Sequence, residues 1–81
     1  MNQDRQRLRN SLAHRLGVRI RRLRRRRAMS QEELAERAGI SVSFLSMLER
    51  GRRLPHLETV VKLADVLGVT LSQFFDLDAR D

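Results

Sequence analysis

The sequence predicts a small all-helical domain, and three observations support this fold class. The chain has 81 residues, which is enough for one domain. Its apolar residues recur at spacings of three and four, as on one face of a helix, and no segment shows the two-residue alternation of a strand. Helix-starting Ser or Thr and helix-ending Gly residues punctuate this pattern at short intervals. The sequence therefore predicts five short helices.

The first helix is predicted over residues 12–27. Its apolar stripe, which continues upstream, consists of Leu8, Leu12, Leu16, Ile20 and Leu23. Gly17 interrupts the segment and weakens the helix by up to ~1 kcal/mol relative to Ala. We therefore predict a domain over residues 12–77. A basic arm over residues 1–11 precedes it, as either a disordered segment or a helical extension.

The second helix is predicted over residues 31–38. Ser30 and Glu33 have the spacing of a capping box, in which each side chain bonds the other residue's backbone N–H. Gly39 follows the last apolar residue and is expected to end the helix in a left-handed conformation. This glycine allows the chain to turn sharply into the next helix.

The same kinds of signal bound the remaining helices. The third is predicted over residues 42–50, with Ser41 as its N-cap, and the fourth over residues 57–67. Thr70 and Gln73 repeat the capping-box spacing and open a short fifth helix that holds Phe74 and Phe75. The last residues, 78–81, are predicted to form a frayed tail.

The segment from Gln31 to Arg50 carries the functional prediction. Ala35 is small enough for two helices to approach closely where they cross, and Gly39 permits the positive φ of a tight turn. Leu45 and Leu48 are expected to fix the third helix against its neighbours. This arrangement is a helix-turn-helix, whose second helix enters the major groove of DNA.

The charge of the chain is concentrated in one segment. The formal net charge is +7, but residues 1–27 contribute +10 and residues 28–81 contribute −3. The basic segment contains four consecutive arginines, at residues 24–27. Such an asymmetric charge favours a polyanionic partner, either a nucleic acid or an anionic membrane surface.

Several functional classes are excluded or disfavoured. The chain has no Cys, which excludes disulfides and thiolate metal sites, and neither His14 nor His56 has a ligand-spaced partner. No acidic residue in a suitable pattern accompanies the Ser cluster of the third helix, so a hydrolase is not expected. We predict no enzyme activity, cofactor or metal. No apolar run approaches the ~20 residues of a membrane span, and no leader peptide is visible, so we expect a cytoplasmic, nucleoid-associated protein.

The order of motifs resembles the Cro/repressor-type helix-turn-helix family, also called the XRE family. The resemblance covers about residues 16–75. It rests on Leu16-Gly17, Ser30 to Gly39, Leu45-Ser46, Leu48 to Gly51, Leu57-Glu58-Thr59 and Leu67-Gly68-Val69. It implies a five-helix, lambda-repressor-like DNA-binding domain. Members of this family usually regulate transcription, often as repressors, and bind double-stranded DNA as homodimers on (pseudo)palindromic operators.

The resemblance also implies roles for individual positions. Gln31 is expected to contact the DNA backbone and brace the third helix. Arg24 and Glu49 match a partly buried structural ion pair. The positions expected to face the bases are Ser41, Val42, Ser43, Ser46 and Met47. The positions expected to contact phosphates are Arg50, Arg52 and Arg53.

Two departures from the family pattern leave alternatives open. Val42 and Met47 stand where many relatives have Arg, Gln or Lys, so here they can make only apolar contacts, for instance with thymine methyl groups. An alternative function is therefore a protein-interaction adaptor, such as an antitoxin or a coactivator-like module. A membrane-surface role for the basic first helix ranks last. The apolar C-terminal residues predicted to contribute to a dimer surface are Phe74, Phe75 and Leu77.

Overall fold

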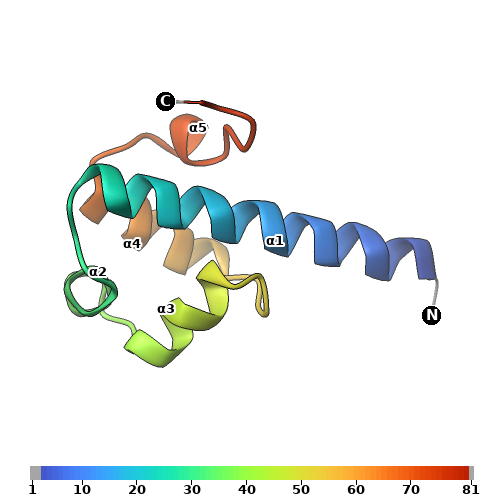
Figure 1. Ribbon diagram of the computed structural model, residues 1–81, viewed down its shortest axis with the longest axis horizontal. Coiled ribbons are helices and arrows are strands. Elements are labelled where there is room, and N and C mark those ends of the chain that lie inside the picture. Colours follow the sequence, from blue (N-terminus) through green and yellow to red (C-terminus); the bar gives the residue numbers. More distant parts are fainter. Residues whose placement is uncertain (1–2, 81) are drawn as a thin grey trace.

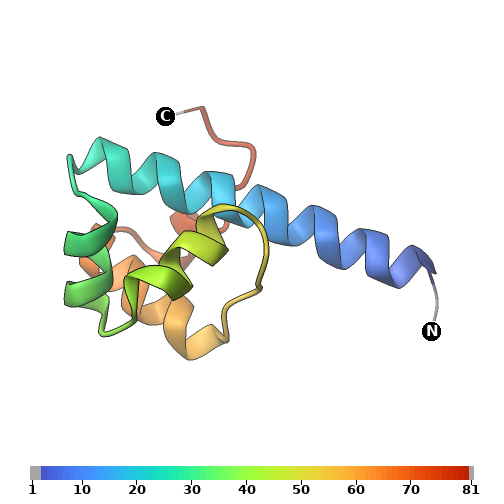
Figure 2. The ribbon, with the colours of Figure 1, turned by 60° about the horizontal axis from the view of Figure 1, so that its bottom comes forward.

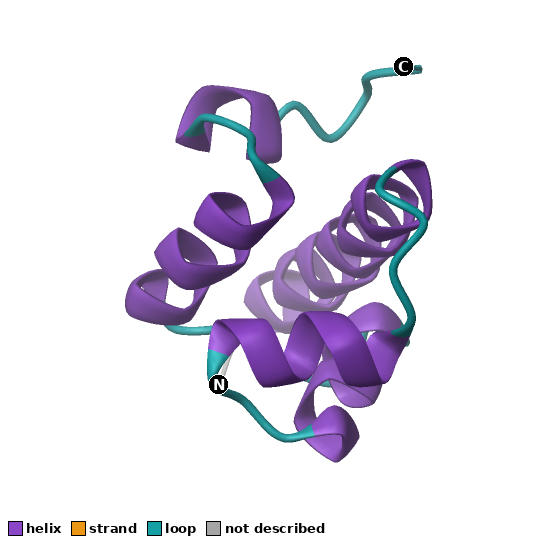
Figure 3. Cartoon of the chain, turned by 90° about the vertical axis from the view of Figure 1, so that its left-hand side faces the viewer, coloured by secondary structure: helices purple, strands orange, loops and turns teal. Residues whose placement is uncertain are grey.

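The computed structural model describes residues 3–80, and within that range every regular element is a helix (Figures 1 and 3). The elements are α1 (Gln3–Arg26), α2 (Gln31–Ala38), α3 (Val42–Glu49), α4 (Leu57–Leu67) and α5 (Leu71–Phe74). The prediction of an all-α fold with five helices is confirmed. Over the same residues, no helix has both the length and the apolar character that crossing a bilayer requires.

Helix α1 runs along the whole length of the molecule. Its 24 residues correspond to about 36 Å at 1.5 Å per residue, close to the 38 Å longest dimension of the chain. The helix begins at Gln3, so residues 3–11 form a helical extension of the predicted first helix, which is one of the two alternatives given for this arm. Asp4 in the first turn complements the helix dipole, and Gln6 donates to Asn10 at 3.1 Å. The N-terminal half projects beyond the other helices (Figures 1 and 2).

The core receives one fully buried side chain from every helix. These side chains are Ile20, Leu34, Leu45, Leu63 and Phe74, each with no accessible surface. The burial of Phe74 corrects the prediction that it contributes to a dimer surface. Because α5 is a single turn, Phe74 faces the core while its neighbour Phe75 is 44% exposed.

Most helix boundaries follow the predicted signals. The hydroxyl of Ser30 accepts from the backbone N–H of Glu33 at 3.0 Å, and the Thr70–Gln73 capping box is complete in both directions. Helix α4 has the predicted bounds. Helix α3 ends one residue earlier than predicted, since Arg50 is its C-cap. Phe75 likewise caps α5 instead of belonging to it.

The C-terminal segment docks on α1. Arg15 forms an ion pair with Asp78 at 2.8 Å, and Arg22 donates to the carbonyl oxygen of Ala79 at 2.6 Å. Asp78 and Ala79, which the sequence assigned to a frayed tail, therefore contact α1, while Asp81 lies outside the described residues. Arg15 and Arg22 of α1 thus supply hydrogen-bond donors and positive charge to the acidic C-terminal segment.

Candidate nucleic-acid interface

The turn between α2 and α3 depends on Gly39. Its φ of 71° lies in the left-handed region, where a side chain would be strained. Its N–H donates to the carbonyl oxygen of Glu36, and the N–H of Ile40 donates to the carbonyl oxygen of Ala35 at 3.0 Å. These two bonds cap the C-terminus of α2. The chain then leaves α2 in a new direction, and α3 lies on the outside of the bundle (Figure 2).

The inner side of α3 is anchored to the core and to α1. Leu45 and Leu48 are completely or almost completely buried. Gly17 of α1 lies against the last turn of α3, where a Cβ atom would come within 2.8 Å of the carbonyl oxygen of Glu49. The absence of a side chain at Gly17 therefore permits the close approach of the two helices.

The outer side of α3 forms one wall of a surface groove of about 430 Å³. Its lining residues are Gln31, Val42, Ser43, Ser46, Met47 and Arg50. The structure thus brings together six of the positions that the sequence resemblance assigns to DNA. Ser41 lies beside this groove at the start of α3, where its hydroxyl oxygen accepts from the N–H of Phe44 at 3.0 Å. That bond leaves the hydroxyl hydrogen available for donation.

A buried charge cluster fixes α3 relative to α1 and α2. Arg24 donates to both carboxylate oxygens of Glu49, from Nε at 2.7 Å and from Nη2 at 3.0 Å. The Nε2 atom of Gln31 donates to Oε1 of the same carboxylate at 3.0 Å. Arg24 also donates from Nη1 to the carbonyl oxygen of Met29 at 2.8 Å, which holds the connection between α1 and α2.

The electrostatics of this cluster favour its charged form. Burial alone would raise the pKa of the Glu49 carboxyl, but the hydrogen bonds from Arg24 and Gln31 hold the pKa below its usual value. The hydrogen bond to Glu49 raises the pKa of Arg24. The ion pair therefore remains fully formed at neutral pH and acts as a rigid connection beneath the groove.

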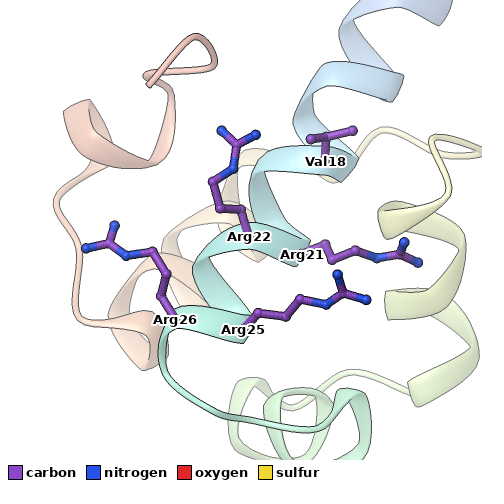
Figure 4. A pocket seen from close by; sticks show the side chains of 5 residues that line it. All are labelled: Val18, Arg21, Arg22, Arg25 and Arg26. Carbon is purple, nitrogen blue, oxygen red and sulfur yellow. The ribbon is translucent and has the colours of Figure 1, made fainter. Parts of the chain in front are cut away.

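The arginine run of α1 is divided among different partners. Arg24 and, at 3.4 Å, Arg21 bond Glu49, whereas Arg27 donates to the carbonyl oxygen of Leu67 at 2.8 Å. Arg25 is exposed and points, like Arg21, toward α3 (Figure 4). Arg22 and Arg26 point away from α3 (Figure 4). The four arginines and Val18 line a surface depression of about 390 Å³. Much of the positive segment therefore stabilises the fold, which composition alone could not show.

The loop after α3 presents further cations. Arg52 and Arg53 are exposed, and the guanidinium carbon of Arg53 lies 5.9 Å from the ring centroid of Phe44. This distance is within the range of a cation–π contact. Phe44 is itself half-buried against the core, and it positions Arg53 next to the end of α3.

Other chemistry finds no support in the described part of the chain. Between residues 3 and 80, no group of three or more His, Cys, Asp or Glu residues lies in a position to hold a metal ion. His14 and His56 are both exposed and lie on different elements. The groove on α3 therefore offers polar, apolar and cationic groups for binding, and no catalytic group is recognisable in its lining.

Comparison with known proteins agrees with this geometry. The sequence model of the helix-turn-helix family HTH_3 matches residues 20–74, which is more than half of the chain. The chain is a Cro/repressor-type (XRE) helix-turn-helix protein. The uncharacterized HTH-type transcriptional regulator y4dJ of Sinorhizobium fredii is 47% identical over 55 residues, covering 68% of this chain and 71% of that protein.

Two further similarities extend this assignment. The immunity repressor protein of Bacillus phage phi105 is 40% identical over 57 residues, covering 70% of this chain but only 40% of the repressor. The restriction-modification controller protein C.AhdI from Aeromonas hydrophila has a crystal structure that superposes with a TM-score of 0.75 at 35% identity, covering 78% of this chain and 96% of that one. HTH_3 proteins are DNA-binding transcriptional regulators and not enzymes. The predictions of DNA-binding regulation and of no enzyme activity are therefore confirmed.

One member of the cluster around Glu49, Arg21, was not singled out by sequence reasoning. Gln31 was expected to brace the third helix, and it bonds the same carboxylate. The spacing of Arg21 and Arg24, one helical turn apart, was the available signal, because it places both side chains on one face of α1.

Proposed function

We propose that this helix-turn-helix protein is a sequence-specific transcriptional regulator that binds a (pseudo)palindromic operator as a homodimer. The observation that carries the proposal is the α3 groove, which lies on the outside of the bundle and is held from below by the Arg24–Glu49–Gln31 cluster. A helix fixed in this way can enter the major groove, which is about 12 Å wide, without rearranging.

In this proposal, sequence is read by a small set of side chains. Ser43 and Ser46 offer hydroxyl groups to base edges, and Val42 and Met47 offer apolar contacts to thymine methyl groups. Such contacts discriminate less than bidentate Arg or Gln contacts do. We therefore expect operators rich in A·T pairs at the contacted positions, with part of the specificity coming from the deformability of the DNA.

Affinity is supplied mainly by contacts to phosphates. Gln31, Arg50, Arg52 and Arg53 surround α3 and are the groups we assign to the DNA backbone. Each arginine that neutralises a phosphate releases a bound counterion, so binding is expected to weaken steeply as salt rises. The site of action is then chromosomal DNA in the cytoplasm.

A homodimer accounts for the exposed apolar surface near the C-terminus. Phe75 and Leu71 of this region are each more than 40% exposed, and Leu77 is partly buried. Covering such residues with a second copy removes apolar surface from water. In the proposed dimer a two-fold axis passes through this surface, and we expect the two copies of α3 to lie one helical turn of DNA apart, at about 34 Å.

Selection of bound sites from random duplex DNA tests the proposal. Enrichment of a motif with two inverted halves, spaced by about one helical turn, is the expected result. A gel-shift titration of the recovered duplex at two salt concentrations between about 50 and 200 mM should then show a steep loss of affinity. No enrichment, together with no binding to any duplex, would refute DNA binding.

The apolar residues of the groove favour a second candidate, a protein-interaction adaptor. Val42 is 40% exposed and Met47 lines the groove, so α3 offers an apolar patch that a partner protein could cover. If this function holds, Met47→Asp abolishes partner capture while Arg52→Ala has little effect. For a DNA-binding regulator, Arg52→Ala should instead have a clear effect, and it should lower the affinity for every duplex by a similar factor.

A further inference from the structure

The projecting half of α1 forms a basic cleft together with the loop that follows α3. The cleft has a volume of about 260 Å³. One wall comes from a single face of α1, with Gln6, Arg9 and Asn10, and the other from the loop, with Arg52 and Arg53. His56 completes the lining at the start of α4. The family match begins only at residue 20, so the α1 wall lies outside it.

The charge of this cleft is unbalanced. Three guanidinium groups, from Arg9, Arg52 and Arg53, line it, and no carboxylate does so among the described residues. Like charges gathered around one cleft repel each other, and an anion placed between them relieves that repulsion. The lining is mostly polar, and its guanidinium groups are charged donors that match the acceptor oxygens of a phosphate.

The two walls are held in fixed positions. Gly51 packs directly on α1, where a Cβ atom would lie 2.9 Å from the Cα of His14. Arg53 is steadied by its contact with the ring of Phe44. The backbone of the two walls is therefore held in place before any ligand arrives, and one of the three arginines has a fixed side-chain contact.

The position of the cleft selects its ligand. Arg50 lines the groove on α3, and Arg52, two residues further along the chain, lines the cleft. A polyanion bound along α3 therefore meets the cleft as it passes the end of this helix. We propose that the cleft binds the phosphate backbone of duplex DNA and that Arg9, on the projecting half of α1, is a direct phosphate contact. This inference rests on the proposed function and extends the DNA contact surface beyond the helix-turn-helix.

Two substitutions that remove the same charge test the proposal. Arg9→Ala removes the cleft arginine, and Arg7→Ala removes an exposed arginine two residues away, on the opposite face of α1, that does not line the cleft. Both variants change the net charge and the long-range field almost equally. Only the first removes a phosphate contact, so the pair separates contact from general attraction.

The measurement is the association constant for a duplex carrying the selected site, at several salt concentrations between about 50 and 200 mM. For Arg9→Ala, the slope of log K against log[salt] is expected to shrink by about 0.9 for each subunit that loses a contact. The same relation makes the loss at 0.1 M salt about eightfold per lost contact. Arg7→Ala should leave the slope unchanged, and Arg9→Lys should retain most of it. Circular dichroism of each variant checks that α1 stays helical, and Arg9→Gln replaces Arg9→Ala if it does not.

The outcomes separate this inference from the proposed function. If the wild-type protein binds no duplex, the proposed function fails. If it binds, and Arg9→Ala changes slope and affinity no more than Arg7→Ala does, the proposed function stands and the phosphate contact at Arg9 is overturned.

Discussion

Gly17 of α1 lies directly against the backbone of Leu48 in α3. A Cβ atom at this position would overlap the carbonyl oxygen of Leu48 and come within 2.8 Å of that of Glu49. The contact occurs at the last turn of α3, beside the Arg24–Glu49 pair. A single hydrogen atom in place of a side chain therefore sets how closely the long helix approaches the helix assigned to DNA.

We predict that Gly17→Ala destabilises the protein although Ala is the better helix former. The overlap involves backbone atoms that cannot rotate away, so α1 and α3 must separate, at a cost of about 1–3 kcal/mol in the free energy of unfolding. Urea unfolding measures this change. Ser11→Ala, at an exposed position of the same helix, is the control and should be neutral or stabilising. An equally stable Gly17→Ala protein would contradict the proposed packing role.

The same residue shows where sequence reasoning succeeds and where it stops. From the sequence, Gly17 is only a weak point in a helical stripe, because its partner is 31 residues away in α3. The bounds of α4 were predicted correctly because its apolar pattern and its terminal Gly68 are local signals. The start of α1 stayed open between two alternatives, because the apolar stripe continues upstream to Leu8 but no local signal separates a helical extension from a disordered arm.

The groove and its supporting cluster were predictable to different degrees. The outward positions of α3, such as Ser43 and Met47, follow from the helix period once the turn at Gly39 is placed. The burial of Phe74 and the docking of Ala79 depend on how a one-turn helix packs against α1, which no local pattern encodes. The cleft of Arg9 and Arg52 joins segments more than 40 residues apart and is visible only in three dimensions.

The Arg24–Glu49 pair should behave as a coupled unit. We predict that Arg24→Ala lowers the free energy of unfolding by about 3–5 kcal/mol, because it leaves the buried Glu49 carboxylate without its main partner. Replacing both residues, as in Arg24→Met with Glu49→Leu, should recover most of that loss. Chemical denaturation of the two single variants and the double variant completes the cycle. A double variant as unstable as the sum of the singles would rule out coupling.

The stability of the protein should depend on pH through Glu49. Its pKa is lowered in the folded state, so the unfolded chain, with a carboxyl pKa of about 4.3, binds the proton more readily. The contribution of the carboxylate is therefore fully present above about pH 4.3 and is lost as the pH falls through the lower, folded pKa. Arg24 stays protonated throughout and adds no slope in this range.

Thermal unfolding between about pH 2 and pH 6 measures this dependence. The wild-type melting temperature should decline more steeply in acid than that of Glu49→Gln, which is less stable at neutral pH but carries no titrating group at this position. Curves that run parallel over the whole range would show that other carboxyls, and not Glu49, account for the acid sensitivity.

The proposed dimer makes Phe75 and Leu8 a matched pair of test sites. Both are large, exposed apolar residues, but Phe75 lies at the end of α5 and Leu8 on the projecting half of α1. Placing a charge in an apolar interface opposes association, because the charge must be desolvated without a partner. We therefore predict that Phe75→Glu is monomeric by sedimentation equilibrium, whereas Leu8→Glu associates as the wild type does. Phe75→Glu should also lose the preference for a site with two inverted halves over a single half-site, since each subunit then binds alone. The opposite result, a monomer only for Leu8→Glu, would move the subunit contact from α5 to α1.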